Sequence, residues 1–169
     1  MQRAAGSTGR TLMMQQRGNP MKTFLAVLIA GFFAFSAMAQ TESATPEDAK
    51  ELVLKAADVL AKDGKEKAYR AYQDRSGPYW KGELYVFIIN FDGVWESYPP
   101  KPEAVGTSLL TLKDIDGNLF VKAMIDVAQT RGEGWVDYKW KNPETNRIQP
   151  KTSYVKRVGD VLVGAGVYK

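Results

Sequence analysis

The sequence predicts a domain of the α+β class, in which one antiparallel sheet carries helices on a face. Three observations lead to this class. Apolar residues recur at helical spacing in the stretch that follows Pro46. From Leu84 onward the pattern changes to short runs rich in β-branched and aromatic residues. Three more such runs close the chain, and the order of helices first and strands last is typical of a single α+β domain.

The helical part begins with a recognisable start signal. Thr45 is a candidate N-cap, Pro46 takes the first helical position, and two acidic residues follow in the first turn. Asp63-Gly64 predicts the end of this helix. We expect a second helical piece over residues 65–74 and a later helix over residues 119–129.

The expected strands follow from period-two or continuous apolar runs between turn signals. They cover residues 84–89, 94–98, 135–141, 151–158 and 161–168. Asp92-Gly93 and Gly159-Asp160 are tight-turn sequences. The prolines of residues 99–102 predict a loop, since proline cannot donate to a sheet ladder. Residues 106–112 leave the choice open between a loop and a single helical turn.

The N-terminal 39 residues have the layout of a secretory leader. A basic start at Met21-Lys22 precedes an apolar run over residues 23–35, and Ala37-Met38-Ala39 is a small-x-small cleavage sequence. That run is too short to span a bilayer as a helix, although an uncleaved anchor is the competing interpretation. The predicted organisation is upstream sequence before a later start at 1–20, a signal peptide at 21–39, a flexible tail at 40–45 and one domain at 46–169.

This organisation changes the meaning of the chain's basic charge. The leader carries four of the 23 basic residues and none of the 19 acidic ones, so cleavage after Ala39 leaves 19 of each. A neutral mature chain gives no reason to expect a nucleic-acid partner. We expect a periplasmic or secreted protein that is not inserted in the membrane after cleavage.

Catalytic and metal chemistry find little support in the composition. The chain has no histidine and no cysteine, which excludes Ser-His and Cys-His nucleophile pairs and the usual zinc sites. Asp114-x-Asp116-Gly117 does not match a calcium loop, whose glycine comes at the sixth position. Glu133 and Asp137 are a weak candidate for a carboxylate pair. We therefore expect no enzyme, no metal and no cofactor.

Aromatic residues with a few lysines among them make a binding site for a small anion the better prediction. The candidate residues for lining it are Tyr85, Phe87, Tyr98, Trp135, Tyr138, Trp140, Lys151 and Tyr154. Tyrosine hydroxyls can donate while the rings pack, and a lysine ammonium can bind a carboxylate. The alternatives are core packing for the aromatics and solvent exposure for Lys151. In a regular strand Lys151 and Tyr154 face opposite ways, so both reach one cavity only if Lys151 lies at an irregular start after Pro150.

The order and spacing of several short motifs resemble one sensor family. The pieces are Asn90-Phe91-Asp92-Gly93, Tyr98-Pro99, Gly106, Asp116-Gly117, Gly134, Val136-x-Tyr138-x-Trp140 with Pro143, Lys151-x-x-Tyr154-Val155 and Gly164-x-Gly166-Val167-Tyr168. Together they resemble the second type of single Cache domain, the extracytoplasmic sensor module of bacterial chemoreceptors and histidine kinases. The resemblance covers nearly all of the expected mature chain.

This resemblance implies a long N-terminal helix behind a PAS-like five-stranded antiparallel sheet, with short connecting helices and a small-ligand chamber on the inner face. It also implies short organic acids or related metabolites as ligands. Tyr98 stands where the family tends to have histidine. We expect no second membrane segment and no signalling domain, so the protein would act through a membrane sensor kinase, chemoreceptor or transporter. The alternative function is a structural or adaptor subunit of an envelope complex that binds no ligand.

Overall fold

The computed structural model describes residues 43–169. The predicted signal peptide and the interpretation of residues 1–20 lie outside these described residues. Residues 43–169 lie within one compact unit, which is the unit described below. Within the described part of the chain, no helix has both the length and the apolar character that a membrane span requires.

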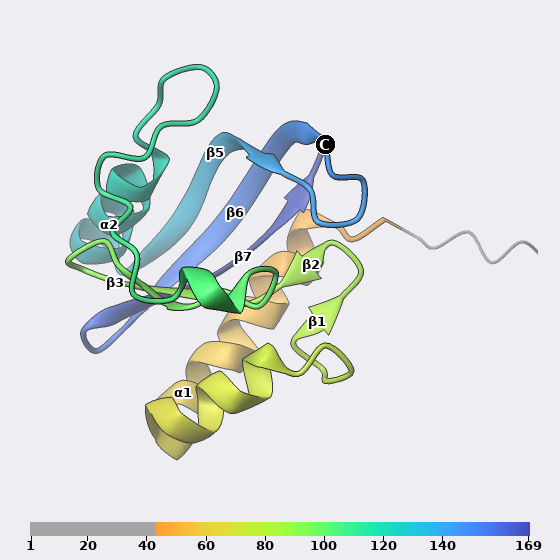
Figure 1. Cartoon of the computed structure of the whole chain (residues 1–169). Helices are drawn as coiled ribbons and strands as arrows, with labels where there is room; N and C mark the ends of the chain where they lie inside the picture. The colour runs from red at the N-terminus through yellow and green to blue at the C-terminus, as the bar shows by residue number, and fades with distance from the viewer. Residues whose placement is uncertain (1–42) are drawn as a thin grey trace, which may run out of the picture. The chain divides into compact units, whose positions relative to one another are not determined.

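The first helix, α1, spans Pro46–Gln73 and confirms the predicted start signal (Figure 1). The Thr45 hydroxyl accepts a hydrogen bond from the Asp48 backbone N–H, and the Asp48 carboxylate accepts one from the Thr45 N–H. This reciprocal pair is a capping box. Gly64 interrupts the helix with a φ of 79°, a conformation that only glycine adopts at little cost. The two helical pieces predicted from the sequence are therefore the two halves of α1.

Five strands form the main sheet, which is antiparallel throughout and has the order β4-β3-β7-β6-β5. Their bounds are β3 Phe87–Asn90, β4 Trp95–Ser97, β5 Glu133–Lys141, β6 Ile148–Val158 and β7 Val161–Tyr168. The three long strands at the C-terminal end form the meander expected from the sequence. A long helix followed by such a sheet is the predicted PAS-like fold.

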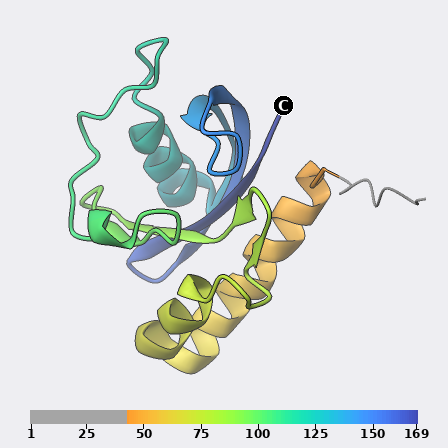
Figure 2. The same ribbon diagram turned by 45° about the vertical axis from the view of Figure 1, so that its right-hand side comes forward.

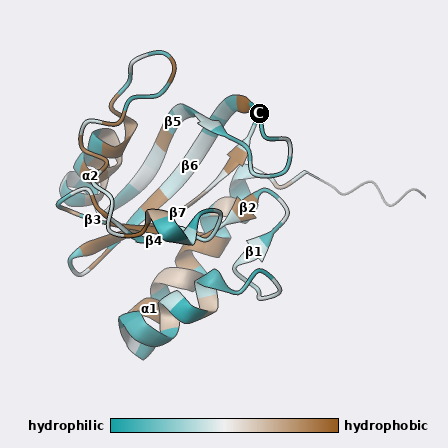
Figure 3. Ribbon diagram, in the orientation of Figure 1, coloured by the Kyte–Doolittle hydropathy of each residue, from teal (hydrophilic) through white to brown (hydrophobic). Residues whose placement is uncertain are grey.

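Helices cover both faces of this sheet, rather than one (Figure 2). α1 packs against β6 and β7 on one side, which we call the α1 face. The second helix, α2, spans Phe120–Arg131 and packs against β5 on the other side, the α2 face. The buried strands β3 and β7 carry much of the hydrophobic colour in Figure 3, whereas the second half of α1 is mainly hydrophilic.

The predicted strand over residues 84–89 is divided in the structure. Leu84–Tyr85 form β2, which pairs with β1, Trp80–Lys81, in a separate two-stranded hairpin. Only after Val86 does the chain enter the main sheet as β3. The prediction was wrong because the run is apolar throughout, so its hydrophobic pattern contains no signal for the change of partner.

The connections add detail to the prediction and correct it at one boundary. A short 3-10 helix, η1, occupies Pro102–Ala104 within the proline-rich loop. Residues 106–112, where a loop or one helical turn was expected, form a loop with one turn, in which the Leu112 N–H donates to the Leu109 carbonyl at 3.0 Å. Strand β6 begins at Ile148 and runs through Pro150, where the sequence predicted a loop. The Pro150 carbonyl accepts a hydrogen bond of 2.9 Å from the Lys169 N–H, which extends the pairing of β6 and β7 past the predicted boundary.

The register of the last three strands determines which side chains share a face. Lys151 of β6 lies between Tyr138 of β5 and Tyr168 of β7. Residues directly opposite in antiparallel strands point to the same side. These three side chains therefore all project from the α2 face, at the end of the sheet where the chain leaves β7.

Candidate functional site

The structure brings six of the eight predicted site residues to the α2 side of the molecule. They are Tyr85, Phe87, Tyr98, Tyr138, Trp140 and Lys151. The prediction that Trp135 and Tyr154 share a chamber with them is wrong, because both alternate to the α1 face. The two rings meet edge to face there at 5.0 Å between centroids, and Trp135 is 40% exposed.

Lys151 is the central residue of this site because it is a buried cation. Its side chain is only 1% exposed, although it belongs to a regular part of β6 and not to an irregular strand start. The ammonium donates to the hydroxyls of Tyr85 at 3.1 Å and Tyr168 at 3.3 Å. It also lies 4.3 Å and 4.4 Å from the centroids of the same two rings, within cation–π range. We call these three residues the Lys151 site.

The electrostatics of the site follow from this burial. Among the described residues, no carboxylate lies within ion-pair distance of Lys151. Loss of solvent lowers the pKa of the Lys151 ammonium from 10.5 to about 7, and the charge of Glu83 opposes part of this fall. Burial raises the pKa values of Tyr85 and Tyr168 far above their usual range, so both phenols stay neutral near pH 7.

Aromatic rings enclose the Lys151 site on the sheet side and toward α2. Phe120 stacks on Tyr138 at 4.5 Å, and Trp95 stacks on Tyr98 at 4.4 Å. The Tyr138 hydroxyl is within 3.0 Å of the Ser153 hydroxyl. The interior is thus a packed aromatic cluster with hydroxyl groups among the rings, and its one buried ammonium, within the described residues, is that of Lys151.

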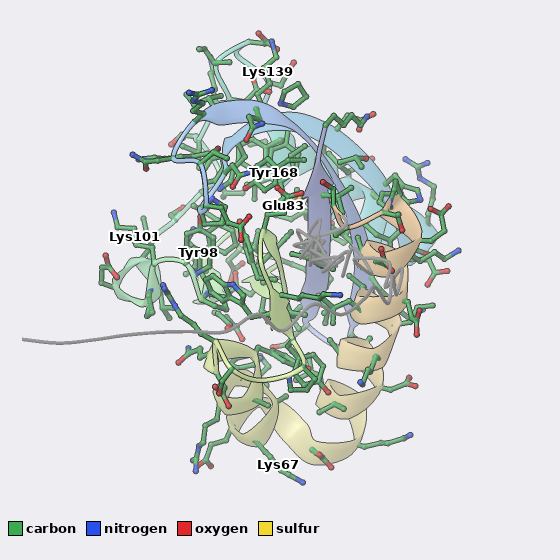
Figure 4. All side chains as sticks on the ribbon, turned by 90° about the vertical axis from the view of Figure 1, so that its right-hand side faces the viewer. Lys67, Glu83, Tyr98, Lys101, Lys139 and Tyr168 are labelled. Atoms are coloured by element: carbon green, nitrogen blue, oxygen red, sulfur yellow. The ribbon has the colours of Figure 1, made fainter. Side chains whose placement is uncertain are left out.

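An open groove of about 800 Å³ borders this cluster. Tyr98 and Trp80 form its aromatic side, and the Trp140 indole N–H donates to the Tyr98 hydroxyl at 3.1 Å. Lys101 lies at its outer rim, on the same side of the molecule as Tyr98 in Figure 4. Lys151 does not line the groove, since Tyr85 lies between Lys151 and Trp80. A molecule in the groove would reach the lysine only if these rings moved.

The β1–β2 hairpin covers the site from outside the main sheet. Within the hairpin the Trp80 ring packs against the Tyr85 ring, with 5.4 Å between the centroids. The Arg75 guanidinium carbon lies 4.6 Å from the Trp80 ring centroid. At the tip of the hairpin, the Asn142 side-chain amide donates a hydrogen bond of 2.8 Å to the Glu83 carboxylate. The hairpin therefore supplies Tyr85, one of the two hydroxyl groups that accept hydrogen bonds from the Lys151 ammonium, and it is bound to the turn that follows β5.

The acidic residues considered from the sequence have structural partners. Asp114 accepts hydrogen bonds from the backbone N–H groups of Asp116, Asn118 and Lys139, so it organises a turn. Glu133 pairs with Lys156, and Asp137 pairs with Lys169. In the described residues no three acidic side chains gather as a metal site would require.

Sequence reasoning missed two residues of the site, Tyr168 and Glu83. Tyr168 is the β7 neighbour of Lys151, and its hydroxyl also donates to the Lys141 carbonyl at 2.9 Å. Period-two alternation places it on the correct face once the register of β6 and β7 is known. Glu83 gave no signal, because the hairpin that carries it was not predicted.

Comparison with known proteins agrees with this geometry. The family model for single Cache domain 2 matches residues 13–169, which is most of the chain. The chain belongs to this family. Cache domains of this type are extracytoplasmic, and they sense signals for chemoreceptors and sensor kinases. A Cache domain is thus a sensory module, and the site on the α2 face has to be understood in that setting.

Two curated relatives align over half of the Cache chain. Sensor histidine kinase MctS of Rhizobium johnstonii is 34% identical over 86 residues, and the methyl-accepting chemotaxis protein McpP of Pseudomonas putida is 27% identical over 86 residues. The matched segment is 18% of the kinase and 16% of the receptor, so the chain corresponds to a small part of each relative.

Solved structures show the same fold. A methyl-accepting chemotaxis protein of Vibrio parahaemolyticus superposes with a TM-score of 0.63 at 21% identity, covering 72% of this chain and 86% of that one. A periplasmic sensor domain of a chemotaxis protein gives 0.58 at 25% identity, with 72% and 88% covered. A Cache chemosensory domain described for carboxylic acid recognition gives 0.57 at 24% identity, with 72% and 86% covered.

Proposed function

We propose that this Cache domain senses short organic acids, and that the Lys151 ammonium binds the carboxylate of the ligand. The observation that carries the proposal is the buried cation without an ion-pair partner among the described residues. Burying such a charge is costly unless a group of opposite charge accompanies it. The carboxylic acid recognition described for one structural neighbour supports the same ligand class.

The neighbours of Lys151 suit a small acid. Two of its three N–H donors are directed to the hydroxyls of Tyr85 and Tyr168. The Tyr85 hydroxyl can donate to the same carboxylate, whereas the Tyr168 hydroxyl already donates to the Lys141 carbonyl. The rings of Tyr98 and Tyr138 provide apolar contact for a short carbon chain. A ligand of about five heavy atoms, at a ceiling of about 1.5 kcal/mol per atom, reaches a dissociation constant of about 3 μM at the tightest. That affinity suits a sensor of nutrients.

Binding of a carboxylate to Lys151 predicts a specific pH dependence. The charged lysine is the form that binds, its pKa is about 7 before binding, and the ligand raises that pKa. Simple carboxylates stay ionised from pH 6 to pH 8, and the phenols of Tyr85 and Tyr168 stay neutral. The affinity for propionate should therefore be about tenfold weaker at pH 8 than at pH 6.

Isothermal titration calorimetry with propionate across this range measures the effect. The lysine must take up a proton on binding above pH 7, so the measured heat should also depend on the ionisation enthalpy of the buffer. An affinity that stays constant from pH 6 to pH 8, with no buffer dependence, would contradict binding at Lys151.

The proposed action is through a membrane protein. The two curated relatives are a sensor histidine kinase and a chemotaxis protein, which supports a partner of this kind for the signal of the Cache domain.

A second function, that of an adaptor in an envelope complex, has one observation in its favour. The aromatic cluster is filled by its own side chains, as the stacked pairs at Tyr98 and Tyr138 illustrate. A thermal-shift screen of short acids in which no acid stabilises the protein would favour the adaptor.

A further inference from the structure

Glu83 is an acidic side chain held in a fixed place beside the Lys151 site. Its carboxylate accepts a hydrogen bond of 2.8 Å from Asn142, which is only 1% exposed. The amide oxygen of Asn142 accepts from the backbone N–H groups of Glu144 and Thr145, so the amide group cannot turn freely. The Glu83 carboxylate is therefore oriented by the turn after β5.

Glu83 and Lys151 are joined to consecutive residues at the end of β5. Tyr168 links the lysine to the Lys141 carbonyl through contacts of 3.3 Å and 2.9 Å, and the next residue, Asn142, holds Glu83. The charge of Glu83 acts on the Tyr168 phenol, and the two residues are labelled near each other in Figure 4. Within the described residues the Glu83 carboxylate and the Lys151 ammonium form no ion pair. The negative charge of Glu83 nevertheless opposes part of the fall in the Lys151 pKa that burial causes.

We propose that Glu83 selects the ligands of the Lys151 site by charge, so that α-amino acids and monocarboxylates bind in preference to dicarboxylates. This inference rests on the proposed function. In the binding form, with Lys151 protonated, Lys151 and Glu83 together carry no net charge, so a dicarboxylate adds two negative charges beside Glu83 and an amino acid adds none. The ammonium of an amino acid is in addition attracted to Glu83.

The expected size of this selection follows from Coulomb's law. If the Glu83 carboxylate and the second charge of a ligand lie about 8 Å apart at an effective dielectric constant of about 20, their interaction changes the binding constant by about thirtyfold. The other groups that contact the lysine, the hydroxyls of Tyr85 and Tyr168, are neutral and do not discriminate between ligand charges. The negative charge of Glu83 also acts on Lys151 itself, since it opposes the fall of the lysine pKa that burial causes.

The test uses Glu83→Gln, which removes the charge and keeps an oxygen that can accept from Asn142. Calorimetry at pH 7.5 compares propionate with malonate, which has a second carboxylate, and with alanine, which has an ammonium. We expect the affinity of malonate relative to propionate to rise at least tenfold in the variant, and that of alanine relative to propionate to fall at least threefold. These ratios are independent of the fraction of Lys151 that is charged, because that fraction affects all three ligands equally.

Glu144→Gln is the matched control. Glu144 is an exposed residue whose carboxylate lies next to the hairpin turn at Gly82, and among the described residues it forms no hydrogen bond or ion pair with Lys151. Both ratios should stay within twofold of wild type in this control. Unchanged ratios in Glu83→Gln, or an equal change in both variants, would overturn the inference alone. If the wild-type protein binds none of the three acids, the proposed function fails and the inference fails with it.

Discussion

Replacement of Lys151 by methionine should abolish carboxylate binding and at the same time stabilise the ligand-free protein. Methionine has a similar length and no charge to desolvate. The shift of the Lys151 pKa from 10.5 to about 7 corresponds to an unfavourable free energy of about 5 kcal/mol for charging the buried ammonium. Part of the gain is offset by the lost hydrogen bonds to Tyr85 and Tyr168, so we expect a net rise of about 2 kcal/mol or more in unfolding free energy at pH 6.

The pH dependence of this stability difference has a definite sign. In the wild type the unfolded chain binds the Lys151 proton more tightly than the folded protein does, so wild-type stability rises as pH increases from about 7 to about 10.5. The advantage of Lys151→Met should therefore be largest at or below pH 7 and should shrink above it. Urea unfolding at pH 6 and pH 9 measures this difference.

Lys139→Met is the control for this experiment. The Lys139 side chain is 40% exposed and pairs with Asp116 at the surface. Its replacement should change the unfolding free energy by less than about 1 kcal/mol and leave propionate binding intact. Loss of stability in Lys151→Met at pH 6, or propionate binding at wild-type affinity in that variant, would contradict the assignment of Lys151 as the ligand-binding cation.

The second large effect is expected at Gly166, where β6 and β7 approach closely. A Cβ atom at this position would lie 2.4 Å from the Thr152 carbonyl oxygen and 2.8 Å from the Ser153 Cα. Because these are backbone atoms of a central strand, they cannot yield as the end of a flexible side chain would. Gly166→Ala should therefore lower the unfolding free energy by about 3 kcal/mol, at the upper end of overpacking effects.

Gly159→Ala provides the comparison for this substitution. Gly159 lies in the turn between β6 and β7 with a φ of 58°, and no atom lies within 4 Å of a Cβ placed there. Its cost is limited to the left-handed backbone, about 1–2 kcal/mol. Thermal and urea unfolding of both variants should rank Gly166→Ala as clearly the less stable. An equal or smaller loss at Gly166 would show that the strands separate more easily than this packing implies.

Much of the fold follows from local sequence patterns. The capping box at Thr45 and the break at Gly64 are local signals, and both are present in the structure. The β1–β2 hairpin was not predictable in this way, because strands of two residues are too short to show a period. The division of the apolar run at Val86 depends on which strand each half pairs with, and that choice is made by tertiary contacts.

The candidate site was predictable in its residue types but not in its arrangement. Aromatic residues with lysines indicated an anion site, and strand alternation correctly placed Lys151 and Tyr154 on opposite faces of a regular strand. The extension of β6 through Pro150, which a proline does not suggest, places Lys151 inside the strand and not at its start. Tyr168 enters the site only through the register of β6 and β7. Long-range pairing therefore determines which of the predicted residues meet.

A crystal structure of the protein with propionate tests the central claim most directly. We expect one carboxylate oxygen within hydrogen-bond distance of the Lys151 Nζ, with Tyr85 or Tyr168 contacting the same carboxylate. Entry of the ligand should be accompanied by a shift of the β1–β2 hairpin, because Tyr85 now separates the lysine from Trp80 at the open groove. A propionate bound in that groove, with Lys151 still held by both tyrosines, would contradict the account.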